Sequence, residues 1–189
     1  MKKIDRKTWI LAGVMLIVIT LLTWLLRADI KHGEKALGYW TMGDVGIYVA
    51  AALLGGPLSA IVAALGSMFA DLFAGHAVYA VGSFLIKGVM AYFVAWHIKR
   101  GSTLVHLIKS VSFGGIWMVV AYFLYDFALY GNYADAAIGL PINILQVVAC
   151  GIVAVLVLFL LGGKSYRSGN GFFAGKASQP SANSKRALK

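Results

Sequence analysis

The chain has 189 residues, of which 60% are hydrophobic and only 13% are charged, and its net charge is +10. A soluble domain has roughly 45–50% apolar and about 25% charged residues, so this composition argues against a free-standing water-soluble fold. A basic excess also occurs in nucleic-acid-binding proteins. Here, however, most Lys and Arg residues lie at the ends of apolar segments, as in membrane helices that keep positive charge in the cytoplasm. We therefore expect a protein of the lipid bilayer with no nucleic-acid partner.

The first apolar segment, residues 8–26, carries no charge and follows Lys2, Lys3, Arg6 and Lys7. Its length is close to the ~20 residues that a helix needs to cross the hydrocarbon core. A cleaved signal peptide is the alternative, but its apolar stretch would be about 7–15 residues long and would end at a small-residue cleavage site. The segment therefore predicts a retained first membrane span.

The second apolar segment, residues 45–70, is long enough for one helix or for two short ones interrupted at Gly55-Gly56-Pro57. Proline breaks a helix interior but is favoured in the first turn of a new helix. Two helices, 43–55 and 57–73, also place the N-terminus, the loop at Lys99-Arg100 and the basic C-terminal tail on one side of the membrane. That arrangement agrees with the tendency of positive charge to remain in the cytoplasm.

The remaining predicted spans are residues 79–98, 107–130 and 141–161, the last with Pro141 in its first turn. The predicted fold is an all-α bundle of six transmembrane helices with both termini cytoplasmic, and residues 1–162 form the membrane domain. Residues 163–189 predict a basic, disordered cytoplasmic tail. No strand pattern stands out in the outer loops 27–42, 72–78 and 131–140.

Six polar side chains within or at the edge of the predicted spans fall in the outer half of the membrane. They are Asp44, Asp71, Lys87, Asp126, Asn143 and Gln146. An ion channel needs polar groups through the full thickness of the bilayer, because each unsolvated stretch is a barrier to a charge. This distribution instead predicts a pocket that opens to the outside and is closed below, with aromatic side chains nearby for a small planar ligand.

The role of each polar residue stays open at this point. Lys87 lies well inside a span, where it contacts a ligand or forms a structural ion pair with Asp71 or Asp44. Asn143 and Gln146 are three residues apart on one helical face, which favours a shared polar site or an interhelical hydrogen bond. Aromatic residues near helix ends also form interfacial belts without binding anything.

The sequence carries no catalytic or nucleotide-binding motif that fits its surroundings. Gly163-Lys164-Ser165 resembles the end of a phosphate-binding loop, but Leu158 occupies the position of the required glycine and a membrane helix precedes it. Because Cys150 is the single cysteine, a disulfide within the chain is excluded. We expect no enzyme activity, no cofactor and no metal.

Several short motifs, in their order and spacing, resemble one transporter family over residues 39–161. They are Gly43-Asp44, Gly56-Pro57, Ala70-Asp71-Leu72, Ser83-Phe84-Leu85-Ile86-Lys87-Gly88 and Pro141-Ile142-Asn143-Ile144-Leu145-Gln146. The family is that of the membrane-embedded S components of energy-coupling factor (ECF) vitamin transporters, in its riboflavin-type branch. The resemblance implies a six-helix bundle in a prokaryotic plasma membrane. Such a bundle captures a vitamin or its precursor and associates with a shared transmembrane subunit and two ATPase subunits.

The function expected from this resemblance is substrate capture at the outer face of the membrane. The residues that we expect to bind substrate are Trp40, Asp44, Tyr79, Lys87, Tyr122, Asn143 and Gln146, with Asp71 and Lys87 as a possible structural ion pair. Hydroxymethylpyrimidine or a vitamin B6 form is favoured over riboflavin, because Asp and Lys beside aromatic rings suit a compact polar ring. The alternative is a membrane scaffold or assembly protein whose buried charges only pair helices.

Overall fold

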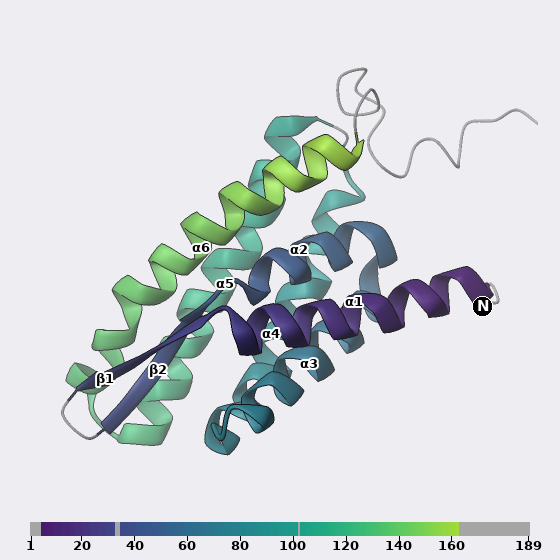
Figure 1. Ribbon diagram of the computed structural model, residues 1–189. Helices are drawn as coiled ribbons and strands as arrows, with labels where there is room; N and C mark the ends of the chain where they lie inside the picture. Colours follow the sequence, from purple (N-terminus) through teal and green to yellow (C-terminus); the bar gives the residue numbers. More distant parts are fainter. Residues whose placement is uncertain (1–4, 33–34, 102, 163–189) are drawn as a thin grey trace, which may run out of the picture.

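The structure is a computed structural model that describes residues 5–32, 35–101 and 103–162, with side chains described outside 30–38. The predicted tail, 163–189, lies outside the described residues. In chain order the elements are α1 (Arg6–Leu25), β1 (Arg27–His32), β2 (Lys35–Thr41), α2 (Gly43–Leu54), α3 (Gly56–Phe73), α4 (Ala77–Ile98), α5 (Leu104–Tyr130) and α6 (Tyr133–Gly162). Figure 1 shows the helices running back and forth between two ends of the molecule, with both strands at one of them.

The helices form the apolar bundle that the composition predicts. Five of the described helices are long and apolar enough to cross a membrane, and α2 is a shorter apolar helix. Large apolar side chains such as Ile17, Ile116 and Ile152 are exposed on α1, α5 and α6. Outward-facing apolar side chains on helices whose backbone groups bond internally are what a lipid environment requires. The chain is therefore a membrane protein.

The short helix α2 lies in the middle of the bundle, where it contacts α1, α3, α4 and α6. The predicted break between 43–55 and 57–73 is confirmed: α2 ends at Leu54, and Gly55 then adopts a φ of +74°, a left-handed conformation that glycine reaches readily. Pro57 lies in the first turn of α3. With 12 residues, α2 rises only about 18 Å, well short of the ~30 Å hydrocarbon core.

The all-α prediction holds for the bundle but is wrong for the first connection. Within 27–42, which was expected to be a loop without strands, β1 and β2 pair as an antiparallel hairpin in which Arg27 faces Thr41. Tyr39, Trp40 and Thr41 are residue types that favour strands, but two short strands in a charged segment give little periodicity. The hairpin lies against α6 through β2.

The predicted start of the last helix is also wrong. The helix α6 begins at Tyr133, so Pro141 lies inside it and most of the predicted loop 131–140 is helical. Asn132 explains the earlier start, because its side-chain Oδ1 accepts a hydrogen bond from the Ala134 amide at 2.9 Å. A side-chain acceptor of this kind stabilises the first turn of a helix.

The bundle has two ends, the hairpin end and the far end. The hairpin end holds β1 and β2, the end of α3 and the start of α6. The far end holds the start of α1, the α2–α3 and α4–α5 connections and the end of α6 (Figure 1). Between the two ends, α1 packs closely on α3: a Cβ built on Gly66 would lie 2.9 Å from a side-chain carbon of Ile19, and the Thr20 hydroxyl donates to the Gly66 carbonyl at 3.1 Å.

Candidate functional site

A cavity at the hairpin end is lined by residues from β2, α4, α5 and α6. Its lining residues are Tyr39, Thr41, Tyr79, Lys87, Tyr122, Asp126, Gly139, Ile142, Asn143 and Gln146. Its empty volume is about 410 Å³ with the open mouth included, but only about 30 Å³ admits the centre of a water-sized sphere. Because one water needs roughly 10–15 Å³ by that measure, the cavity as it stands is narrow and has room for about two waters.

The ion pair between Lys87 and Asp44 lies at the base of this cavity. The Lys87 Nζ is 2.5 Å from Asp44 Oδ1, and the two side chains are 4% and 1% exposed. The same Nζ lies 2.9 Å from the Met118 sulfur and 5.3 Å from the centre of the Tyr122 ring. Lys87 lines the cavity, whereas Asp44 lies behind it and neutralises its charge. Both alternatives for Lys87 thus remain compatible with its position.

Gln146 connects this ion pair to the hairpin. Its Nε2 donates to Asp44 Oδ2 at 2.7 Å, and its Oε1 accepts from the Thr41 backbone amide at 3.0 Å. Asn143 lines the cavity one turn earlier on the same face of α6, as the three-residue spacing predicts. Both amides line the cavity, and the amide of Gln146 is hydrogen-bonded to the protein at both ends.

Asp71 does not pair with Lys87, and this part of the sequence prediction is wrong. The Asp71 side chain, buried at the end of α3, accepts a hydrogen bond at Oδ1 from the Tyr39 hydroxyl. Burial raises the pKa of the Tyr39 hydroxyl well above its ordinary value, and the neighbouring Tyr122 and Asp71 reinforce that shift. Tyr39 therefore remains a neutral donor, and its bond to Asp71 fastens the hairpin to the bundle.

Tyrosines occupy the wall of the cavity next to Asp126. The Tyr79 hydroxyl donates to Asp126 Oδ1 at 3.1 Å and lies 2.7 Å from the Tyr130 hydroxyl. The Tyr122 hydroxyl lies 2.7 Å from the Ser83 hydroxyl. The predicted aromatic residues Tyr79 and Tyr122 thus line the cavity, with their hydroxyls hydrogen-bonded to the protein.

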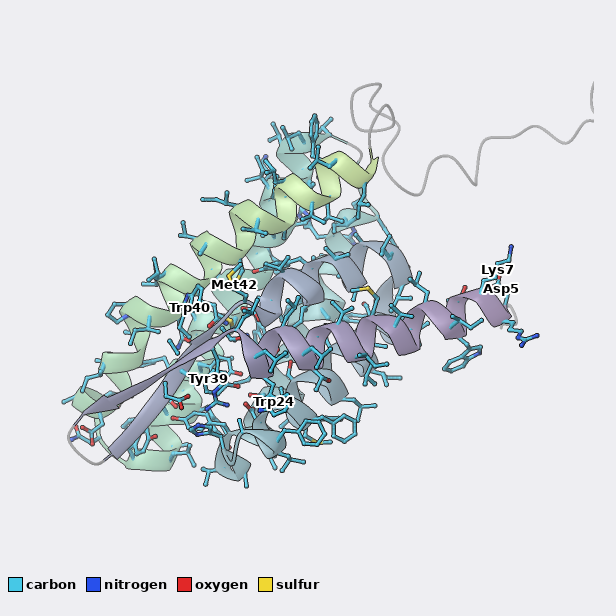
Figure 2. The ribbon with its side chains drawn as sticks, viewed as in Figure 1. Asp5, Lys7, Trp24, Tyr39, Trp40 and Met42 are labelled. Carbon is cyan, nitrogen blue, oxygen red and sulfur yellow. The ribbon has the colours of Figure 1, made fainter. Side chains whose placement is uncertain are left out.

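Trp40 does not line the cavity, contrary to its predicted stacking role. Successive side chains of a strand point to opposite faces, and Tyr39 and Thr41, on either side of Trp40, are the ones that line it. The Trp40 indole nitrogen is buried and has no hydrogen-bond partner among the described residues. Figure 2 labels both aromatic residues on the hairpin, beside the bundle and far from Asp5 and Lys7 at the start of α1.

Five residues that line the cavity were not among the expected substrate-binding residues, and of these only Asp126 was among the polar residues that predict the pocket. The five are Tyr39, Thr41, Asp126, Gly139 and Ile142. A signal for Asp126 was present, because it lies four residues after Tyr122 and therefore on the same face of α5. Tyr39 and Thr41 could have been predicted only if the first loop had been recognised as containing a strand.

Among the residues that the structure describes, no group of three or more His, Cys, Asp or Glu side chains is placed to hold a metal ion.

A polar and aromatic cavity near one end of a membrane-embedded bundle is a site of the kind that small molecules occupy in proteins. The chain belongs to the family described as ECF-type riboflavin transporter, S component, whose family model matches residues 3–163. The resemblance predicted from the short motifs is thereby confirmed. A curated relative from Pyrococcus woesei, named "Uncharacterized protein in gap 3'region", is 30% identical over 113 residues, which cover 60% of this chain and 74% of the relative.

Membership in this family defines the general role of the chain. S components are the substrate-binding subunits of vitamin transporters and work with shared ECF components, so the family is not a class of enzymes. The chain is accordingly a membrane transport protein rather than a catalyst.

Proposed function

We propose that this chain captures a small planar vitamin or vitamin precursor in the cavity at its hairpin end, as the substrate-binding subunit of an ECF-type importer. The observation that carries the proposal is the convergence of Lys87, Asp126, Asn143 and three tyrosines on one cavity inside an otherwise apolar bundle. Polar groups in a membrane interior are costly, and such residues mark substrate sites when they face a cavity.

The proposed orientation places the hairpin end outside the cell. The basic residues Arg6, Lys7, Lys99, Arg100 and Lys109 all belong to the far end of the bundle. Positive charge is retained on the cytoplasmic side of membrane proteins, which favours a cytoplasmic far end and both termini inside. In this proposal α2 is a sixth, short crossing that is shielded from lipid by its neighbours, residues 1–162 form the membrane domain, and the membrane is a prokaryotic plasma membrane.

The proposed ligand is hydroxymethylpyrimidine or a vitamin B6 form, with riboflavin next. The narrowness of the cavity favours a single compact ring, because a larger ring system requires more side chains to move before it can enter. The substrate contacts are assigned to Tyr79, Lys87, Tyr122 and Asn143. Asp44 holds Lys87 in place from behind, and Gln146 in turn holds the Asp44 carboxylate.

The energy for import comes, in this proposal, from partners. A shared transmembrane subunit and two ATPase subunits carry out ATP hydrolysis, and this chain supplies substrate recognition. The alternative is a scaffold or assembly protein in which the Lys87–Asp44 pair serves stability alone.

Thermal unfolding of the purified chain with a panel of vitamins separates these two functions. A ligand present at 100 times its dissociation constant stabilises the folded state by about 2.7 kcal/mol. We expect such a shift with at least one small aromatic vitamin and none with the same vitamin when the chain carries Tyr122→Ala. A chain that responds to no vitamin is a scaffold rather than a capture subunit.

A further inference from the structure

The carboxylates around the cavity outnumber its cations. In the described part of the chain, the buried Asp, Glu, Lys and Arg side chains are Asp44, Asp71, Asp126 and Lys87. All four belong to the half of the bundle that contains the cavity. Lys87 forms its ion pair with Asp44, which leaves two buried carboxylates whose partners come from neutral tyrosine hydroxyls. Fully ionised, this group of four therefore carries a net negative charge.

Among the described side chains, the basic groups next to the hairpin are Arg27 and His76, and both pair with Asp29 rather than with Asp126. Arg27 lies 2.5 Å from Asp29 with its guanidinium over the Tyr39 ring, and the His76 ring nitrogen lies 3.5 Å from the same Asp29 carboxylate. The two side chains thus share the Asp29 carboxylate of the hairpin. A buried carboxylate without a cation is destabilising unless it takes up a proton or a cationic partner.

Of the two carboxylates, Asp126 is the one that lines the cavity. It is only 4% exposed, and Tyr79 occupies its Oδ1. Its Oδ2 faces Gly139 of α6: a Cβ built there would lie 3.1 Å from that oxygen and 3.7 Å from Asn143 Nδ2. The Gly139 backbone thus packs against this carboxylate. Because position 139 carries no side chain, Asp126 and Asn143 both remain on the cavity wall, where a ligand group that donates hydrogen bonds can reach them.

We propose that the cavity selects ligands with a protonated amine or an amino-substituted aromatic ring, and that Asp126 is the residue that binds this group. The proposal rests on the proposed capture function and sharpens its substrate class. The ligand brings the positive charge or N–H donors that the protein lacks there, while Asn143 contacts the adjacent edge of the ring. A neutral ligand of the same size leaves the Asp126 carboxylate without a partner and binds more weakly.

The test compares ligand pairs that differ only in this group. Pyridoxamine and pyridoxine differ by an amine against a hydroxyl, and hydroxymethylpyrimidine is paired with its analogue in which the exocyclic amine is replaced by hydroxyl. Calorimetric titration of the full chain in detergent should give an amine preference of about 10- to 100-fold in at least one pair. Asp126→Asn, which keeps the shape, should abolish that preference by weakening only the amine. The control Asp29→Asn, on a carboxylate that is 39% exposed in the hairpin, should leave it intact.

The unfolding temperature gives a second readout that does not depend on ligand. Because Asp126→Asn removes an uncompensated buried charge, the ligand-free variant should unfold at or above the wild-type temperature. A large decrease shows instead that the carboxylate has a structural partner, and it overturns the proposal.

The other outcomes separate this inference from the capture function itself. If the hydroxyl compound of each pair binds as tightly as the amine compound or more tightly, or if riboflavin alone binds, the amine selectivity is wrong. Vitamin capture by the cavity is not contradicted by these results. If Asp126→Asn weakens both members of a pair equally, the residue shapes the cavity and does not bind the amine. Binding of none of these compounds contradicts both proposals.

Discussion

The ion pair at the base of the cavity allows a quantitative test of the packing described above. Lys87 Nζ and Asp44 Oδ1 are 2.5 Å apart, and both side chains are almost fully buried. Removing one partner of such a pair leaves an uncompensated buried charge, which costs about 3–5 kcal/mol. For a chain of this size, 1 kcal/mol shifts the unfolding temperature by roughly 2–4 °C, so Lys87→Met should lower it by about 6–20 °C.

The double variant Asp44→Asn/Lys87→Met should recover most of that loss. Asparagine keeps an oxygen acceptor for the Gln146 amide while removing the charge, and replacing a buried pair with neutral groups is often close to neutral in stability. Thermal unfolding of the two single variants and the double variant gives the coupling energy. We expect it to be about 5 kcal/mol or more, because each single variant leaves an unpaired buried charge and the double variant leaves none. Lys109→Met, on an exposed lysine of α5, is the matched control and should change little. If Lys87→Met destabilises the chain no more than this control, the pair does not stabilise the bundle.

Other contacts make separate predictions. Tyr39→Phe removes the hydrogen bond to Asp71 and should lower the free energy of unfolding by about 1–3 kcal/mol. The hairpin amides should then exchange hydrogen faster than in wild type. Unchanged exchange would show that this bond does not hold the hairpin. Gly66→Ala brings a Cβ against α1 and should cost about 1–3 kcal/mol, whereas Gly13→Ala, with open space around it, should be neutral or stabilising in thermal unfolding. Trp40→Phe should leave the titrated affinity for the bound vitamin within about twofold, because Trp40 is not a cavity residue; a tenfold loss would contradict that assignment.

The features that the sequence predicted well depend on local chemistry or on helical period. The break between α2 and α3 follows from the glycines and the proline at 55–57, whose backbone preferences act within a few residues. Asn143 and Gln146 line one cavity because their three-residue spacing fixes a common helical face. Lys87 faces the cavity because a charge inside a span needs a polar environment.

The features that could not be predicted from the sequence depend on contacts between distant segments. Lys87 pairs with Asp44 rather than Asp71 because of how α2 and α4 pack, and no spacing along the chain distinguishes the two partners. Trp40 was expected to line the cavity as an aromatic residue near a helix end. Because it lies in a strand, its side chain points to the face opposite that of Tyr39 and Thr41, which line the cavity. The start of α6 depended on the single side chain of Asn132, whose capping effect outweighed the signal from Pro141.

Native mass spectrometry of the chain purified from its membrane can show vitamin capture itself, because it detects a bound small molecule without prior choice of ligand. We expect one vitamin-sized molecule per chain. Gly139→Val, whose side chain would meet the Asp126 carboxylate on the cavity wall, should remove this molecule, whereas Gly13→Val on α1 should not. A wild-type chain that carries no such molecule after incubation with a vitamin mixture, or a Gly139→Val chain that retains it fully, would contradict capture in this cavity.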